Sequence, residues 1–113
     1  MENTKQKDNI TFDDFLKLDV RICEVIKARR VDKSDKLIEL SIDTGFDLRI
    51  AVTNLGEFLG TEHFEGKLFP FMLNLEPRKV FGIMSNAMIL ASIDNDGGVE
   101  TLESDAEAGS VII

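Results

Sequence analysis

The sequence predicts an all-β fold, a small closed barrel of five strands. Short runs in which hydrophobic and polar residues alternate recur along the chain, most clearly at residues 37–43. Turn-forming residues separate these runs, including Thr44-Gly45 and the DNDGG segment at 94–98. The length of 113 residues, 43% of them hydrophobic, suits one domain that buries its own core.

The N-terminal region is expected to form a tail and one short helical turn. Residues 1–10 are mostly polar and are predicted to be a flexible tail. Thr11 has the position of a helix N-cap with Asp14 three residues later, a variant of the capping box. The helix predicted at 11–17 has an apolar side, and we expect it to close one end of the barrel. That side consists of Phe12, Phe15, Leu16 and Leu18.

The first strand begins at Asp19 and is expected to contain a β-bulge. Val20 and Ile22 alternate with a polar neighbour, but the pattern resumes out of phase at Val25 after Cys23 and Glu24. Such a phase slip is typical of a bulge, which lets one strand bend and pair with two neighbours. The following segment 27–36, KARRVDKSDK, is predicted to be a charged connector.

The second and third strands are predicted at residues 37–43 and 48–53. In each strand, every second residue is a large aliphatic one, and we expect these residues to face the core. The two expected core faces comprise Ile38, Leu40 and Ile42 in the second strand, and Leu48, Ile50 and Val52 in the third.

The second half of the chain contains a helical insert and the remaining strands. Residues 54–66, with three glycines, suit a short helix or turn packed on the core. Further strands are expected at 67–75, 87–93 and 99–102, followed by a C-terminal extension. This order of elements favours a five-stranded OB-fold barrel with a helical insert between strands 3 and 4. A β-sandwich is the alternative, although seven comparable strands are hard to find.

The residues that usually carry catalysis are scarce. His63 is the only histidine and lies in a polar stretch, which favours an ordinary surface residue. Cys23 is the only cysteine, which excludes an internal disulfide and a multi-cysteine zinc site, and its place in a strand favours burial over nucleophilic chemistry. No glycine-rich loop carries the lysine of a P-loop. The sequence therefore predicts a protein that is not an enzyme and has no cofactor or metal.

The net charge of −8 and the pI of about 4.6 argue against a uniformly basic nucleic-acid binder. The acidity is uneven, however. Residues 94–113 hold six acidic and no basic side chains, which leaves 13 basic and 15 acidic side chains in residues 1–93. Residues 17–36 hold seven basic and four acidic side chains. The composition therefore allows a local basic surface with modest, salt-sensitive affinity.

Nothing in the sequence indicates a membrane. No apolar run approaches the ~20 residues that cross a bilayer. The N-terminal residues lack the apolar core of a signal peptide. We therefore expect a soluble, cytoplasmic protein.

Two segments carry unusual polar groups. The connector at 27–36 is rich in Lys and Arg, although a solvated loop is the simpler interpretation of this segment alone. The segment at 74–91 places Arg78 and Lys79 after a rigid proline and contains the polar pair Ser85-Asn86. Basic side chains can neutralise phosphates, and hydroxyl and amide groups can bond sugar or base edges. A loop that only packs on the core is the alternative.

Three motifs in one collinear order resemble a known family. They are DFLKLDVRIC at 14–23, SDKL at 34–37 and NLEPRKVFGIMSNAMILA at 74–91, of which the third is the most specific. The chain from Thr11 onward resembles the tRNA-binding domain shared by the C-terminus of methionyl-tRNA synthetases, the endothelial monocyte-activating polypeptide II (EMAP II) module and free-standing bacterial tRNA-binding proteins.

The resemblance implies that residues 11–113 form one OB-fold domain that binds tRNA by shape and backbone. It further implies a homodimer, with an aminoacyl-tRNA synthetase as another candidate partner. A chaperone-like or secretion-associated branch of the same family is the alternative. Carried over by motif position, Arg78 and Lys79 would contact phosphate, with Lys36 and Arg49 as additional phosphate contacts. Ser85 and Met88 would flank the RNA beside Asn86, and Asn74 would order the loop.

The sequence departs from the family pattern at several positions. Cys23 and Ala87 stand where the family has glycine, and Asn54 replaces the glycine after the third strand. The chain has no Trp or Tyr, so any base stacking would fall to Phe46 or Phe81. We therefore expect a mainly electrostatic contact with RNA.

Overall fold

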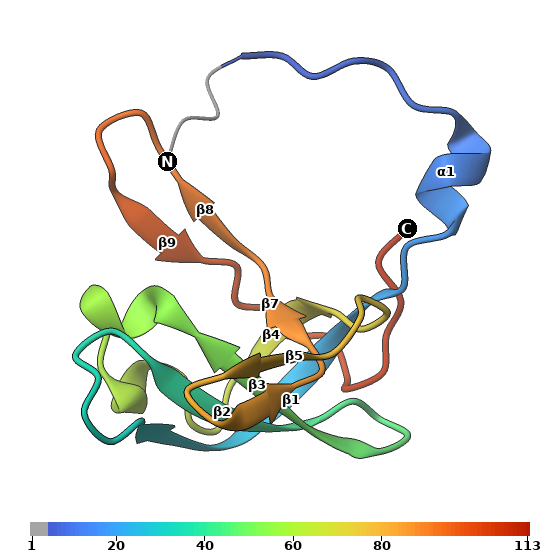
Figure 1. Ribbon diagram of the computed structural model, residues 1–113. Helices are drawn as coiled ribbons and strands as arrows, with labels where there is room; N and C mark the ends of the chain where they lie inside the picture. Colours follow the sequence, from blue (N-terminus) through green and yellow to red (C-terminus); the bar gives the residue numbers. More distant parts are fainter. Residues whose placement is uncertain (1–4) are drawn as a thin grey trace.

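The computed structural model describes residues 5–113 and consists mainly of short β-strands (Figure 1). No helix in this described part is long and apolar enough to cross a membrane. The elements are α1 (Phe12–Leu16), β1 (Val20–Arg30), β2 (Ile38–Asp43), β3 (Leu48–Thr53), the 3-10 helices η1 (Asn54–Glu57) and η2 (Thr61–His63), β4 (Leu68–Met72), β5 (Arg78–Val80), β6 (Ile83–Ser85), β7 (Met88–Ile89), β8 (Ala91–Ile93) and β9 (Val99–Thr101).

Five strands form the predicted barrel. They follow the order β3-β2-β1-β4-β7 in one antiparallel sheet, and β3 also lies against β6 and β7, which nearly closes the barrel. The pairs β5–β6 and β8–β9 are separate two-stranded hairpins. The predicted helical insert between strands 3 and 4 is confirmed as η1 and η2. An all-β, OB-like barrel is therefore the observed fold.

Strand β1 pairs with two neighbouring strands, as the phase slip in its sequence predicted. Its first half pairs with β4 and its second half with β2, and the register shifts between Val25 and Lys27. The shift lies later than expected, because Cys23 and Glu24 still pair in register with β4. Among the described non-glycine residues, Cys23 is not one with positive φ. The bulge therefore does not require glycine at position 23.

The prediction of a connector at 27–36 was wrong for residues 27–30. Strand β1 continues to Arg30, and Arg29 forms an ion pair with Glu39 on the neighbouring strand. Ala28 is buried while the charged residues around it remain exposed. A strand with one solvent-facing side accommodates such a run of charges, so the connector spans only residues 31–37.

The core face predicted for β3 was also wrong. Ala51 and Thr53 are buried, whereas Leu48 is 73% exposed and Ile50 and Val52 are half-buried. The cause is the register with β2, where the buried Leu40 and Ile38 stand opposite Ala51 and Thr53. Residues directly opposite in a ladder share one face of the sheet, so β2 dictates which side of β3 is inside.

Helix α1 has the predicted capping box but not the predicted place. The Thr11 side chain accepts a hydrogen bond from the Asp14 N–H, and the Asp14 carboxylate accepts one from the Thr11 N–H. No residue of α1 is buried, and the helix lies outside the barrel (Figure 1). Residues 5–10 form no helix or strand and are exposed; the first four residues of the predicted tail lie outside the described residues.

The core lies inside the barrel and includes the single cysteine. Phenylalanines 64, 69 and 71 and the inward residues of β2 are completely buried. Cys23 is 0% exposed among them, and burial raises the pKa of its thiol to about 12. The thiol therefore remains protonated and packs as a small hydrophobic group.

We expect Cys23 to be unreactive toward a thiol reagent at pH 8 until the chain unfolds. The same burial predicts that stability falls as the pH rises above 9. Unfolded chains ionise at the ordinary pKa of 9.0, while the folded thiol does not ionise until about 12. Ellman's assay with and without denaturant tests the first expectation, and unfolding curves across this pH range test the second. Rapid labelling of the native protein would contradict the buried position.

Candidate nucleic-acid interface

The barrel is closed at β3 by the side chains of Ser85, at the end of β6, and Asn86, in the β6–β7 turn. The Val52 N–H donates to Ser85 Oγ at 3.0 Å, and the Ile50 N–H donates to Asn86 Oδ1 at 3.3 Å. The Asn86 N–H in turn donates to the Ile50 carbonyl at 3.0 Å. Ser85 Oγ also donates to the Ala87 carbonyl. These bonds fix the β5–β6 hairpin against the edge of the barrel.

Arg49 strengthens the same closure. Its guanidinium donates to the Leu73 carbonyl at 2.8 Å and to the Asn86 carbonyl at 3.5 Å. It also forms an ion pair with Asp47 at 3.1 Å, and its side chain is 20% exposed. A hydrogen bond from Thr44, followed by those from Arg49, holds the pKa of Asp47 below its ordinary value. Arg49 is thus committed to contacts within the chain.

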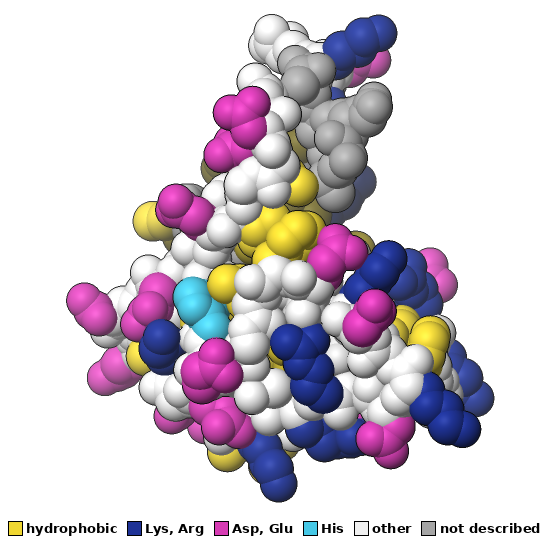
Figure 2. Space-filling model, turned by 90° about the vertical axis from the view of Figure 1, so that its left-hand side faces the viewer, with side chains coloured by type: hydrophobic (Ala, Val, Ile, Leu, Met, Phe, Trp, Pro, Cys, Tyr) yellow, Lys and Arg dark blue, Asp and Glu magenta, His cyan; other side chains and the backbone are white. Residues whose placement is uncertain are grey.

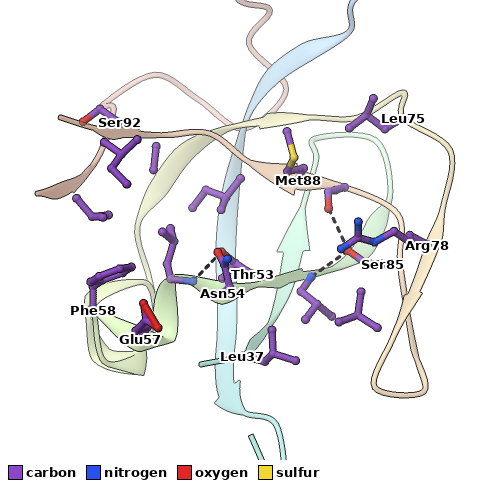
Figure 3. A pocket seen from close by; sticks show the side chains of 18 of the residues that line it. Leu37, Thr53, Asn54, Glu57, Phe58, Leu75, Arg78, Ser85, Met88 and Ser92 are labelled. Atoms are coloured by element: carbon purple, nitrogen blue, oxygen red, sulfur yellow. Dashed lines mark hydrogen bonds between the residues drawn. The ribbon is translucent and has the colours of Figure 1, made fainter. Parts of the chain in front are cut away.

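A groove of about 690 Å³ opens between the β5–β6 hairpin, η1 and the β8–β9 hairpin (Figure 3). Ser85 and Arg78 line it from β6 and β5, where they stand opposite each other in the ladder. Met88 enters it from β7, and Asn54 and Phe58 line the opposite side. The groove therefore combines apolar walls with a few polar groups, an arrangement that suits ligand contact.

The charge of the groove is mixed, and free basic groups lie at its edge. Glu57 and Glu76 line the groove together with Arg78. Arg78 and Lys79 are exposed, and within residues 5–113 neither has a carboxylate within 4.0 Å. On the face shown in Figure 2, acidic side chains are more numerous at the left and basic ones at the lower and right edges. A polyanion is therefore better accommodated beside Arg78 and Lys79 than beside Glu57 and Glu76.

The structure brings only some of the predicted site residues together. Arg78, Ser85 and Met88 line the groove, and Lys79 lies beside Arg78 on β5. Lys36 lies near the η1 end of the groove, where it pairs with Glu57 at 3.7 Å. The other two, Arg49 and Asn86, line a second hollow of about 380 Å³, with Ile26, Leu48 and Met84 among its other residues. A contact of these seven residues with RNA stays a prediction.

The sequence did not identify the η1 and β8–β9 sides of the groove. Asn54, Glu57 and Phe58 form the first side and Ser92 belongs to the second. The available signal was the Thr53-Asn54 pair at the position of a family motif, which marks the start of η1. Asn54 is not among the described residues with positive φ, and Ala87 is buried in the core. Both departures from glycine are thus accommodated.

The remaining reactive residues have structural partners. His63 is half-buried, and its Nε2 lies 2.8 Å from the Thr101 hydroxyl. Within residues 5–113, no group of three or more His, Cys, Asp or Glu side chains could hold a metal ion.

Fold and groove define the class as an OB-type barrel domain that presents basic side chains beside a lateral groove. The particular family follows from comparison with known proteins. Residues 20–111 match the model of the family described as "Putative tRNA binding domain", and the chain belongs to this family. The resemblance seen in the three sequence motifs is thereby confirmed.

The relatives include methionine–tRNA ligases. The chain is 43% identical to that of Bacteroides fragilis over 91 residues and 43% identical to that of Archaeoglobus fulgidus over 111 residues. These matches cover 80% and 96% of this chain but only 13% and 17% of the ligases. The chain therefore corresponds to a small part of these relatives.

Two solved structures of similar length share the fold. A MetRS related protein from Pyrococcus horikoshii aligns with a TM-score of 0.91 and 29% identity, covering 95% of this chain and all of that one. The chaperone CsaA from Bacillus anthracis aligns with a TM-score of 0.82 and 27% identity, covering 94% of this chain and all of that one.

We expect Ser85→Ala to lower the free energy of unfolding by about 1 kcal/mol, because the Val52 N–H loses its acceptor. Ser92→Ala is the matched control, since its Oγ bonds the Glu100 carbonyl on an exposed hairpin, and it should change stability by less than about 0.5 kcal/mol. Urea unfolding of both variants measures the difference. Equal stability of the two would contradict the closing role of Ser85.

Proposed function

We propose that this chain is a non-catalytic tRNA-binding protein that contacts tRNA mainly through backbone phosphates and shape. The observation that carries the proposal is the Arg78-Lys79 pair. Both side chains are exposed, Arg78 lines the groove and Lys79 follows it on β5, and the described residues offer them no carboxylate partner. Membership of a tRNA-binding domain family supports tRNA as the nucleic acid.

A phosphate-based contact agrees with the polar groups of the site. The side chains of Ser85 and Asn86 accept hydrogen bonds from β3 that close the barrel. Few polar groups of the site therefore remain to distinguish base edges. The hairpin that is hydrogen-bonded to β3 instead presents basic side chains to phosphates. Six of the acidic side chains lie in residues 94–113, and exposed charges are screened over about 8 Å at physiological salt. The local basic surface can therefore act despite the net charge.

A role without catalysis is supported by the surroundings of the reactive residues. The Cys23 thiol is buried and protonated, and His63 contacts a threonine hydroxyl. The relatives that this chain matches in part are methionine–tRNA ligases. We therefore propose that it assists an aminoacyl-tRNA synthetase by adding affinity for tRNA.

A chaperone-like, protein-binding role is the second candidate. The similarity to the chaperone CsaA favours it, as do the exposed apolar residues Ile26, Leu48 and Met84 around the second hollow. The two candidate functions predict different results when tRNA competes with unfolded polypeptide for the protein. A chaperone-like surface should bind unfolded polypeptide even when tRNA is present in excess.

We further propose that the chain forms a homodimer through α1. Its apolar side chains Phe12, Leu16 and the following Leu18 are between 47% and 71% exposed. A helix of five residues is not stable on its own without packing. A second copy offers the same apolar side, and such self-complementary contacts are typical of two-fold dimers.

We expect the Arg78→Ala/Lys79→Ala variant to bind tRNA more weakly and with a flatter salt dependence. Each lost phosphate contact should reduce the slope of log affinity against log salt by about 0.9. Gel shifts across a salt series measure the slope. Lys5→Ala/Lys7→Ala is the matched control, because it changes the net charge equally on the N-terminal arm. Absence of tRNA binding by the unaltered protein at low salt would refute the proposed function.

We expect the unaltered protein to have twice the mass of the 12.6 kDa chain in light scattering. Phe12→Glu/Leu16→Glu should give the mass of a single chain, because a buried carboxylate has no partner in an apolar contact. Ile26→Glu changes another exposed apolar residue and should leave the dimer intact. A monomeric unaltered protein, or a dimer unaffected by the α1 variant, would contradict this interface.

A further inference from the structure

The turn of the β5–β6 hairpin holds an aromatic residue in an unfavourable backbone conformation. The strands are joined by Phe81 and Gly82, whose φ angles are +51° and +80°. A two-residue hairpin turn with positive φ at both positions strongly prefers Asn-Gly. Gly82 suits this turn, but a bulky residue with positive φ is an outlier. Folding stability alone therefore does not explain phenylalanine at position 81.

The ring of Phe81 is also available for contact. Phe81 is 64% exposed, and its ring has no aromatic or cation–π partner among the described residues. Phe46 differs, because the guanidinium groups of Arg21 and Arg49 lie 5.4 and 5.6 Å from the centre of its ring. Of the two candidates for base stacking, Phe81 is the one whose ring has no aromatic or cationic partner within residues 5–113.

The position of Phe81 links it to the basic pair. Arg78 and Lys79 precede it on β5, and the hairpin itself is held against the barrel through Ser85. The hairpin thus carries two cations and one aromatic ring within four consecutive residues, 78–81. Cations beside an exposed aromatic ring are the usual elements of a site for single-stranded nucleic acid.

We propose that Phe81 stacks on an unpaired base of the bound tRNA while Arg78 and Lys79 hold neighbouring phosphates. This inference rests on the proposed tRNA binding and specifies which part of the RNA the hairpin meets, an unstacked base in a loop or at an end. Stacking on an aromatic ring is tolerant of base identity, so it adds affinity without reading sequence.

The decisive variant is Phe81→Asn, which supplies the residue that the turn prefers. It should raise the urea midpoint of unfolding and weaken binding of unfractionated tRNA by about tenfold. Gain of stability with loss of affinity separates a binding role from a structural one. Binding of a blunt RNA duplex of similar length, which has no unpaired base, should not change.

A second variant detects stacking directly. The chain has no tryptophan, so Phe81→Trp introduces a single fluorophore whose emission should be quenched when a base stacks on it. Phe46→Trp, at another exposed position, should show no quenching on addition of tRNA. Full affinity of Phe81→Asn for tRNA together with unquenched Phe81→Trp would overturn the stacking proposal, while tRNA binding itself would stand. Equal weakening of tRNA and duplex binding would overturn it as well. Failure of the unaltered protein to bind tRNA would instead refute the proposed function.

Discussion

The hydrogen bonds between the backbone of β3 and the side chains of Ser85 and Asn86 determine the rest of the structure. A five-stranded barrel of this size leaves β3 with unpaired N–H groups, and no continuous ladder reaches across to β7. Ser85 and Asn86 supply the missing acceptors. The same bonds position the β5–β6 hairpin, which carries the exposed basic residues, and they form one side of the groove. The same hydrogen bonds therefore close the barrel and position one side of the groove.

This dual role separates the residues of the family motif into two groups. The Ser85 hydroxyl has one donor and two acceptor positions, and contacts within the chain use the donor and one acceptor. Arg49 is likewise occupied by two carbonyls and a carboxylate. These side chains hold the hairpin and the turn that follows it in place. Arg78 and Lys79 have no such ion pairs within the described chain, so their charges remain available to a ligand.

Sequence reasoning predicted the elements that depend on local pattern and failed where tertiary register decides. The alternation in β2 identified its buried side correctly, and Thr11 and Asp14 identified the cap of α1. In β3, large aliphatic residues occupy the outer side and small ones the inner side, so hydrophobicity alone indicated the wrong side. The groove could be predicted only on the side that carries the 74–91 motif. Its other side is formed by η1 and β8, which approach it only through the closure of the barrel.

The distribution of acidic groups explains how an acidic chain can still orient a polyanion. Glu57 and Glu76 line the groove together with Arg78, and Glu57 is paired with Lys36, whereas no carboxylate of the described residues pairs with Arg78 or Lys79. At physiological salt the field of an exposed charge decays within about 8 Å, so distant acidic residues contribute little at this edge. Arg78 and Lys79 are therefore the part of this surface most favourable to a polyanion.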